Sequence, residues 1–504
     1  MTEFDVVIVG SGVGGACTAY RLARAGVSVL VLERGGYLPK EPENWSPEEV
    51  FLNQRYVARD EKWSLNGGKP EWPASYYNVG GATKMFGGVL ARLRARDLEE
   101  LSFEDGVSPA WPITYQDLEA YYTEAESLFR VHGRLGLDPT EPPHSAGYDF
   151  GPVDHEQTIL NLFNGIRAKG HHPYSLPLAV ERHAGGTCVR CATCDGFPCK
   201  LGAKNDVEQI LVQQLLQRPN VTLKTHSKVE RIVLDEAGRK VDHLIVSTQD
   251  GKIFVRGNVY VLSAGAINSA ALLLRSADER APRGIANSSG LVGRNYMAHN
   301  SSVVMAIGRK KTGVTFQKTM GLNDFYFGDA DYPFPMGNAQ LIGKVSGAVL
   351  ASQTPLMPRS IGDAISARSV DWYVQTEDLP CADSGVRIAN DGTLQLAKVP
   401  TNRRPHREIV KRVSQIMRDQ GYPIVVSREF GIRTTSHQCG TARFGTDPAH
   451  DVLDPYCRTF DHPNLFVIDA SFFPSSSGMN PSLTIAAQAF RAGDHILASE
   501  FGIR

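Results

Sequence analysis

The chain has 504 residues, and its 53 lysines and arginines nearly balance its 54 aspartates and glutamates, for a formal net charge of −1. At about 100–200 residues per domain, this length predicts two or three domains. A charge so close to zero argues against general binding to nucleic acid or to a membrane surface, because both need a basic face. The N-terminus has no signal-peptide pattern, and no apolar run reaches the roughly 18 residues of a membrane span. We therefore expect a soluble, cytoplasmic protein without membrane insertion.

The N-terminal residues predict a complete strand, loop, helix and strand unit. Residues 4–9 (FDVVIV) form a short, β-branched apolar run that is typical of a strand buried on both faces. A glycine-rich loop follows, and residues 16–25 then predict a helix that ends before Gly26. Residues 27–32 predict the next strand, which ends at Glu33. The pattern is typical of a Rossmann-type α/β domain that binds a dinucleotide.

The glycine loop has the spacing Gly10-x-Gly12-x-x-Gly15 of a dinucleotide-binding fingerprint. Gly10 permits the tight turn, Gly12 lets the backbone approach a pyrophosphate, and Gly15 lets the helix pack closely on the sheet. The free N–H groups at the start of the helix would bind the phosphates. Glu33 stands where a carboxylate can accept hydrogen bonds from a ribose diol, which disfavours NADP. The position of the loop at the N-terminus, with Arg34 directly after Glu33, favours FAD over NAD.

Regular patterns recur in the middle of the chain and at its end. Between them, residues 301–428 contain strand-like pieces and loops rich in Gly, Pro and aromatic residues. The other predicted elements, in chain order, are a helix at 113–130, a helix at 207–217, an antiparallel meander of strands at 221–224, 228–234, 243–247 and 252–255, a strand at 259–262, a helix at 269–276, a strand at 465–468 and a helix at 481–498.

The order of these regions predicts one domain that is assembled from several segments. We expect an FAD-binding domain from residues 1–134, 205–300 and 433–504, because dinucleotide signals lie at the start, middle and end of the chain. Residues 135–204 and 301–432 would form a sheet-based substrate-binding domain between these segments. The predicted fold class is α/β for the Rossmann-type domain and α+β for the whole chain.

Several later blocks, together with the glycine loop, resemble the glucose–methanol–choline (GMC) oxidoreductases, a family of flavoproteins. The blocks are NVGGATKMFGG at 78–88, VLSAGAINS at 261–269, SHQCGT at 436–441, and VIDASFFP at 467–474 with GMNPS at 478–482. Within the family, the chain looks most similar to the bacterial pyranose oxidase and glycoside 3-oxidase branch. The resemblance implies an FAD domain, a substrate domain whose large sheet covers the flavin, and hydride transfer from an alcohol to flavin N5.

The resemblance also implies a catalytic pair, His437 and Asn480, which match the family's histidine and asparagine by motif position. An alcohol gives up hydride as its hydroxyl proton is removed, and the pKa of histidine suits a base for that proton. His437 would accept the proton, and Asn480 would position the same oxygen. As an alternative, Asn480 would cap a helix that begins at Pro481. The rival histidines, His299 and His462, fall in no block that places them beside the flavin.

Further cofactor contacts follow from positions in the same blocks. Fungal pyranose oxidases of this family attach FAD through a histidine after the paired glycines, where this chain has Met85, so we expect non-covalent FAD. For each contact a packing role is the alternative. The candidates are Thr83 and Lys84 beside the ring system, Val229 at the adenine, Ala264 after the strand at 259–262, Asp469 and Ala470 near the phosphates and isoalloxazine, and Ser482 in the terminal block.

Four of the eight cysteines form the block Cys188-x2-Cys191-x2-Cys194-x4-Cys199. Its spacing approaches a ferredoxin run, with one extra residue before the last cysteine and no proline after it. Three interpretations are open: free thiols or local disulfides in a compact loop, ligands of an iron–sulfur cluster, or ligands of zinc. A cluster would favour a dehydrogenase that feeds a cytochrome or quinone. Its absence would favour an oxidase or a soluble acceptor.

These observations predict an FAD-dependent enzyme that oxidises a secondary hydroxyl of a pyranose sugar or glycoside, at C3 or C2 by resemblance, to a keto-sugar. We expect O2, or an artificial or quinone acceptor, to reoxidise the flavin, with an oxidase favoured over a dehydrogenase. One alternative is a sugar dehydrogenase with an iron–sulfur cluster on the cysteine block. Another is a non-catalytic binding protein that flavin stabilises.

Overall fold

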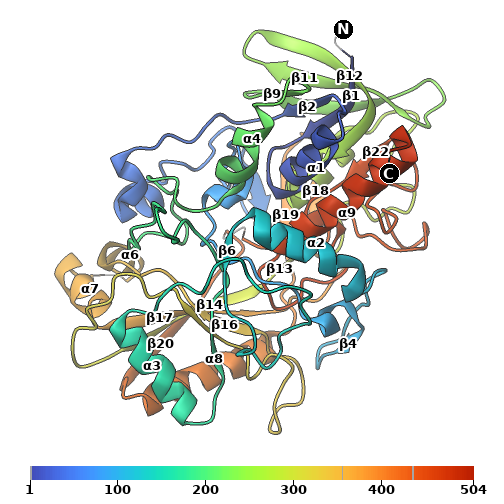
Figure 1. The fold of residues 1–504 in the computed structure, drawn as a ribbon. Coiled ribbons are helices and arrows are strands. Elements are labelled where there is room, and N and C mark those ends of the chain that lie inside the picture. The colour runs from blue at the N-terminus through green and yellow to red at the C-terminus, as the bar shows by residue number, and fades with distance from the viewer. Residues whose placement is uncertain (1–2, 355, 434–435, 504) are drawn as a thin grey trace.

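The computed structural model describes residues 3–354, 356–433 and 436–503 of the chain. Two large β-sheets, one above the other in Figure 1, form its framework. Within the described residues, the upper sheet has seven strands. Five run parallel, in the order β22 (Leu465–Val467), β12 (Gly251–Leu262), β1 (Glu3–Val9), β2 (Val29–Leu32) and β9 (Val221–Lys224). The other two, β10 (Lys228–Leu234) and β11 (Val241–Thr248), extend β12 as an antiparallel meander. This sheet confirms the predicted Rossmann-type region.

The central parallel strands form from apolar runs that are buried along their length. β2 consists of VLVL, and all four residues are buried. α1 (Val13–Arg24) begins three residues before the predicted start and packs beside α9 (Ser482–Phe501), the last helix. α5 (Ala266–Arg275) follows β12 and confirms the helix predicted there within three residues. The first and last segments of the chain therefore belong to one packed unit.

The structure differs from the sequence prediction at three places in the middle of the chain. The strand at 221–224 is β9, which pairs in parallel with β2 instead of joining the meander. The strands predicted at 252–255 and 259–262 are one strand, β12, which pairs first with β11 and then with β1. The helix predicted at 207–217 is a π-helical turn, η5 (Glu208–Val212), followed by α4 (Gln213–Leu215). Tertiary packing selects strand partners, and local alternation does not encode that choice.

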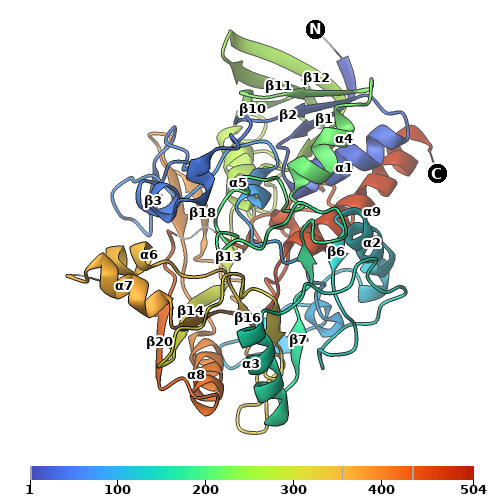
Figure 2. The same cartoon turned by 60° about the vertical axis from the view of Figure 1, so that its left-hand side comes forward.

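The lower sheet has six antiparallel strands in the part of the chain that the structure describes. Their order is β20 (Ile424–Glu429), β14 (Asn300–Ile307), β17 (Ser369–Thr376), β16 (Asn338–Leu341), β15 (Met320–Leu322) and β7 (Pro173–Ser175). α3 (Gln157–Ala168) and α8 (Arg403–Asp419) cover the face that points away from the upper sheet (Figure 1 and Figure 2). The other face points toward the Rossmann-type sheet.

β17 shows how the lower sheet separates an apolar face from a polar one. All eight residues of this strand are buried. Val370, Trp372 and Val374 pack in the core with α3 and α8. Since successive side chains alternate across a strand, Tyr373 and Gln375 lie on the opposite face. Buried polar side chains need hydrogen-bond partners, and this face forms one wall of the candidate site.

A third, small sheet joins segments that the sequence assigns to different domains. β3 (Trp63–Leu65) pairs in parallel with β19 (Leu394–Ala397), which pairs with β18 (Gly385–Ile388). Residues 385–397 therefore pack on the N-terminal segment. No helix in the described ranges combines the length and apolar character of a membrane span. The remaining elements are η1 (Pro42–Trp45), η2 (Glu48–Leu52), η3 (Gly81–Lys84), η4 (Ala95–Leu98), β4 (Leu101–Ser102), β5 (Val107–Ser108), α2 (Tyr115–Leu128), β6 (Val131–His132), β8 (Leu178–Ala179), β13 (Met297–Ala298), α6 (Gly347–Gln353), α7 (Arg359–Ser366), β21 (Gln438–Cys439) and η6 (Ala470–Phe472).

Candidate active site

A short strand pair brings His437 to a second histidine. β21 pairs antiparallel with β13, with Gln438 opposite Ala298, so His437 and His299 are the next positions along the two strands. Their Nδ1 atoms are 2.9 Å apart, and the rings meet edge to face at 79°. No sequence block places His299 beside the flavin, and this contact brings it to the candidate site. No motif surrounds His299, and only the strand register puts it there.

The backbone of His437 adopts a left-handed conformation, with φ of 55°. Gly440, three residues later, has φ of 91°, and an added Cβ there would lie 2.4 Å from the carbonyl oxygen of Asn295. A left-handed conformation at a residue other than glycine costs about 1–3 kcal/mol and concentrates at active sites, where the surrounding structure holds it in place. Tertiary contacts therefore fix the position of the His437 imidazole.

Gln375 connects the histidine pair to Asn480, the second predicted catalytic residue. Its Oε1 lies 3.1 Å from His299 Nδ1, and its Nε2 donates to Asn480 Oδ1 at 3.3 Å. Because Asn480 Oδ1 faces Gln375, the NH2 group of Asn480 is the part of this amide left to donate to a ligand. His437 and Asn480, far apart in sequence, thus belong to one hydrogen-bonded group with His299 and Gln375.

Both imidazoles are neutral at working pH. Burial, the neighbouring His299 and the ammonium group of Lys318 hold the pKa of His437 well below its usual value. Burial lowers the pKa of His299 to about 4, against the opposite effect of its hydrogen bonds to Ser476 and Gln375. A neutral imidazole has a free lone pair, which a general base needs.

The positive charge near His437 comes from Lys318, a buried side chain that no sequence motif marks. It forms an ion pair with Asp195, which lies in the cysteine loop (residues 188–199). An added Cβ at Gly87 would lie 1.9 Å from Lys318 Nζ, so the glycine leaves room for this pair. Asp195 also accepts from the backbone N–H of Gly343 at 2.6 Å. The cysteine loop is therefore fixed against the 78–88 block and the lower sheet at one point.

Asn480→Ala tests the second member of the predicted pair. Pro481 occupies the position before the first turn of α9, and no side chain caps this helix, so the alternative capping role of Asn480 is not observed. We expect the variant to bind FAD but to lose about 10²-fold in kcat, the lower end of the effect of removing an oriented hydrogen-bond donor. Steady-state kinetics with a sugar that the wild type oxidises measure the loss. Unchanged turnover would exclude Asn480 from the chemistry.

The glycine loop contains positions at which the backbone passes too close for a side chain. An added Cβ would lie 2.4 Å from Ser263 O at Gly10 and 2.1 Å from Gly10 O at Gly15. At Gly12 the same atom would meet nothing within 4 Å. Gly10 and Gly15 thus serve the turn and the helix packing, as predicted. Gly12 borders open space at the N-terminus of α1, as the approach of a pyrophosphate requires.

Glu33 is a buried carboxylate at the end of β2. Its Oε2 accepts from the N–H of Ser11 at 3.1 Å and from Ser11 Oγ at 2.6 Å, and its Oε1 accepts from Gly35 N–H at 2.9 Å. Burial raises the pKa of Glu33, and these hydrogen bonds act in the opposite direction. The buried carboxylate at the end of β2 and the loop residues beside it fit an adenine dinucleotide.

Three other predicted cofactor contacts direct their polar atoms to protein partners. Thr83 Oγ1 donates to a backbone carbonyl of its own turn at 2.6 Å. Lys84 is buried and pairs with Asp206 at 3.1 Å. Arg34 pairs with Asp60 at 2.5 Å. Contact of these side chains with FAD stays a prediction.

Asp469 and Ala264 follow two of the parallel strands, at the edge where α/β sheets bind ligands. The Asp469 carboxylate accepts from Gly265 N–H at 2.9 Å and from Ser269 Oγ at 2.6 Å. Burial raises the pKa of this carboxyl against the effect of its hydrogen bonds. Their contact with FAD also stays a prediction. Of the remaining candidates, Val229 lies in β10, Ala470 begins η6 and Ser482 begins α9.

The four cysteines of the 188–199 loop are free thiols. Cys194 Sγ lies 3.7 Å from the carbonyl oxygen of Gly87, and Cys199 Sγ accepts from Ala203 N–H at 3.3 Å. Burial raises the pKa of Cys188, and raises that of Cys194 to about 12. Among the described residues, no group of three or more His, Cys, Asp or Glu side chains is placed to hold a metal ion.

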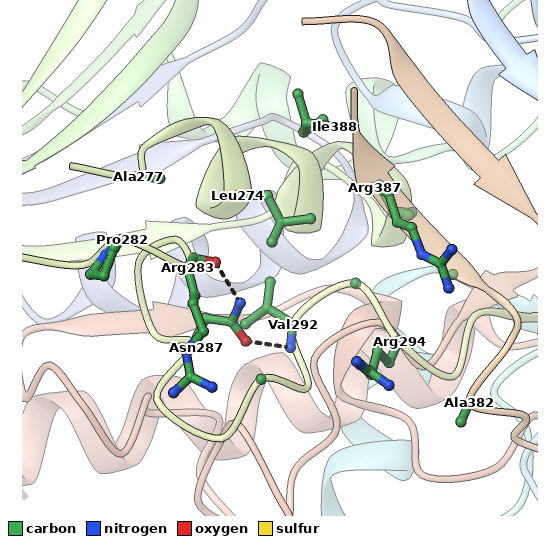
Figure 3. A pocket seen from close by; sticks show the side chains of 14 residues that line it. Leu274, Ala277, Pro282, Arg283, Asn287, Val292, Arg294, Ala382, Arg387 and Ile388 are labelled. Carbon is green, nitrogen blue, oxygen red and sulfur yellow. Dashed lines mark hydrogen bonds between the residues drawn. The ribbon is translucent and has the colours of Figure 1, made fainter. Parts of the chain in front are cut away.

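A cavity of about 410 Å³ lies away from this group, between α5, β18 and the loop at 282–294 (Figure 3). Arg283, Arg294 and Arg387 line it together with apolar residues, and none of the predicted site residues does. A guanidinium group stays protonated at working pH and cannot act as a base. We therefore place the candidate active site at the histidine pair.

The dinucleotide loop and the histidine–asparagine group together define the class of flavoprotein oxidoreductases. Two family models, both described as GMC oxidoreductase, match residues 4–301 and 380–489. The chain therefore belongs to the GMC oxidoreductase family, as its sequence blocks predict, and its cofactor is FAD.

Relatives of known name cover nearly the whole chain. The chain is 32% identical to 6'''-hydroxyparomomycin C oxidase of Streptomyces lividus, over 97% of this chain and 90% of that protein. It is 26% identical to the fructose dehydrogenase large subunit of Gluconobacter japonicus, over 98% and 97%. Pyridoxine 4-oxidase of Mesorbium loti has a similar fold, with a TM-score of 0.65 and 19% identity over 98% of this chain and 99% of that one.

Proposed function

We propose that the enzyme oxidises a secondary hydroxyl of a pyranose sugar or glycoside, at C3 or C2, to a keto-sugar. The observation that carries the proposal is the set of polar contacts, through His299 and Gln375, that joins His437 to Asn480. The relatives named 6'''-hydroxyparomomycin C oxidase and fructose dehydrogenase large subunit support a sugar-like substrate. The buried polar face of the lower sheet supports it as well, because a sugar needs many hydrogen-bond partners.

Each residue of the group has a chemical role in this reaction. The neutral His437 imidazole accepts the hydroxyl proton of the sugar as carbonyl character develops at the carbon. The Asn480 NH2 group donates to the same oxygen and holds it in place. FAD, when bound, supplies the hydride acceptor. The ammonium group of Lys318 stabilises negative charge that develops on the substrate oxygen.

A panel of sugars and glycosides, assayed with O2 and with an artificial quinone, tests the proposal. We expect anaerobic addition of the correct sugar to bleach the oxidised flavin spectrum. Rapid recovery of the spectrum in air would identify an oxidase, and recovery only with the quinone would identify a dehydrogenase. A flavin that no sugar or other alcohol reduces would contradict the proposal and favour the non-catalytic binding protein.

The cysteine loop is the observation that would favour the second candidate, a sugar dehydrogenase with an iron–sulfur cluster. We expect the purified protein to contain FAD and less than one equivalent of iron or zinc, because no group of three or more His, Cys, Asp or Glu side chains among the described residues is placed to hold a metal ion. Elemental analysis and the visible spectrum before and after denaturation measure this. Iron at cluster stoichiometry would contradict the proposed oxidase and favour the dehydrogenase.

All eight cysteines are free thiols, which also supports the proposal of a cytoplasmic location.

A further inference from the structure

Acceptor atoms surround His299, although burial disfavours its charged form. Its Nε2 lies 3.0 Å from the carbonyl oxygen of Ser476, and its Nδ1 lies 3.1 Å from Gln375 Oε1. A carbonyl oxygen only accepts, so we assign the proton of the neutral His299 ring to Nε2, where it bonds Ser476 O. In this neutral form, the Nδ1 atom of His299 carries no proton and offers a lone pair. The His437 Nδ1, at 2.9 Å, must therefore donate to it, which leaves His437 Nε2 free to act as the base.

A chain of buried amides fixes the orientation of Gln375. Asn323 Nδ2 donates to the carboxylate of Asp138 at 2.6 Å, so Asn323 Oδ1 faces Asn338. Asn338 Nδ2 donates to that oxygen at 2.7 Å, so Asn338 Oδ1 accepts from Gln375 Nε2 at 3.3 Å. Since Asp138 only accepts, each amide in the chain has one orientation. Gln375 must therefore present Oε1, and not NH2, to His299.

This arrangement disfavours a bare Nδ1 on His299 and favours a protonated one. Two acceptors, His299 Nδ1 and Gln375 Oε1, face each other at 3.1 Å in the resting pair. A proton on Nδ1 would convert that repulsion into a hydrogen bond, while Nε2 keeps its bond to Ser476. At His437, burial, the neighbouring His299 and Lys318 all lower the pKa, so a positive charge on that ring is disfavoured. Of the two imidazoles, His299 is the better place for a second proton.

We propose that His299 and His437 form a proton relay in which His299 is the final acceptor of the substrate proton. The O–H bond of the sugar breaks as an N–H bond forms at His437 Nε2. The N–H bond at His437 Nδ1 breaks as one forms at His299 Nδ1. The carbon–oxygen double bond forms as the hydride leaves the same carbon, and FAD, when bound, would be the hydride acceptor. The relay rests on the proposed function, and it makes His299 a residue that acts through His437.

A lysine that is paired with an aspartate acts on each of the two imidazoles. Lys318, ion-paired with Asp195, lowers the pKa of His437. On the other side, Lys398 lowers the pKa of His299 but is itself paired with Asp378 at 3.3 Å. The nearby Glu377 has a pKa raised by burial to about 8, so it is neutral at neutral pH. Transfer to His299 places the positive charge between two oxygen acceptors, Ser476 O and Gln375 Oε1.

The matched variants His299→Gln and His462→Gln test the relay. A glutamine at 299 can still donate to Ser476 O but cannot take up a proton, whereas His462 bonds a backbone carbonyl of Arg239 outside the site. We expect H299Q to bind FAD and to lose about 10²-fold in kcat, with an altered pH profile of kcat/KM and a larger solvent isotope effect. H462Q should match the wild type. A slower H299Q with the wild-type pH profile and isotope effect would show a merely structural role and overturn the relay.

Gln375→Glu and a spectroscopic measurement separate the relay from the proposed function. A carboxylate beside His299 should raise its pKa by about 1–3 units, and should shift the acid limb of kcat/KM upward by that amount. Nitrogen-15 NMR of the resting wild type needs no substrate and should find the proton of His437 on Nδ1 and that of His299 on Nε2. A proton on His437 Nε2 would overturn the relay even in an active enzyme. A wild type that oxidises no sugar, with the expected NMR result, would instead overturn the proposed function and the relay with it.

Discussion

His437→Asn should lower kcat for the sugar substrate by about 10²–10⁴-fold, the contribution of a positioned general base, while the enzyme still binds FAD. The imidazole is the neutral base of the hydrogen-bonded group, and asparagine supplies no comparable proton acceptor. Asparagine is the suitable replacement because His437 has φ of 55°, and asparagine adopts this left-handed region more readily than other residues with a side chain. Stopped-flow reduction of the flavin by the sugar measures the loss directly at the chemical step.

His462→Asn is the matched control for this variant. His462 is also buried, and burial also lowers its pKa, but it bonds a backbone carbonyl outside the site. We expect wild-type flavin reduction in H462N. Flavin reduction at the wild-type rate in H437N would refute His437 as the base. His437→Ala would be harder to interpret, because alanine at a positive φ adds backbone strain to the loss of the base.

The Rossmann-type unit was predictable because its signals are local. β1, α1 and β2 follow from apolar runs separated by a glycine loop, and each stands within three residues of its predicted position. β9 was not predictable in the same way. Its sequence, VTLK, alternates as an antiparallel strand does, yet it pairs in parallel with β2. That choice depends on which edge of the sheet is open when the chain returns, and this is a tertiary property.

The candidate site was predictable only where a motif marks it. His437 and Asn480 stand in the family's terminal blocks, but His299 and Gln375 stand in none. His299 reaches His437 through the pairing of β13 with β21, two strands of two residues each, which leave almost no local pattern. Gln375 carries a weak signal: it alternates with Val370, Trp372 and Val374, and a polar residue in a buried strand needs a polar partner.

The Rossmann-type loop leads to the second prediction, which concerns Gly12→Ala. Gly12 precedes α1 with φ of −71°, so alanine meets no backbone strain there, and its Cβ would touch no protein atom within 4 Å. The folded apoprotein should therefore tolerate the change. If the FAD pyrophosphate lies over this backbone, the methyl group occupies its place. Such overpacking costs about 1–3 kcal/mol, which corresponds to a rise of about 5- to 140-fold in the Kd for FAD.

Two further variants make this prediction specific to the cofactor. Gly15→Ala would place a Cβ 2.1 Å from Gly10 O, so it should disrupt the fold itself, which circular dichroism and thermal unfolding report. Gly151→Ala meets nothing within 4 Å and lies outside the loop, so it should bind FAD as the wild type does. Flavin fluorescence titration of the apoproteins measures Kd. An unchanged Kd in G12A would mean that the pyrophosphate does not approach Gly12. Another part of the chain would then have to bind the cofactor and position the flavin beside His437.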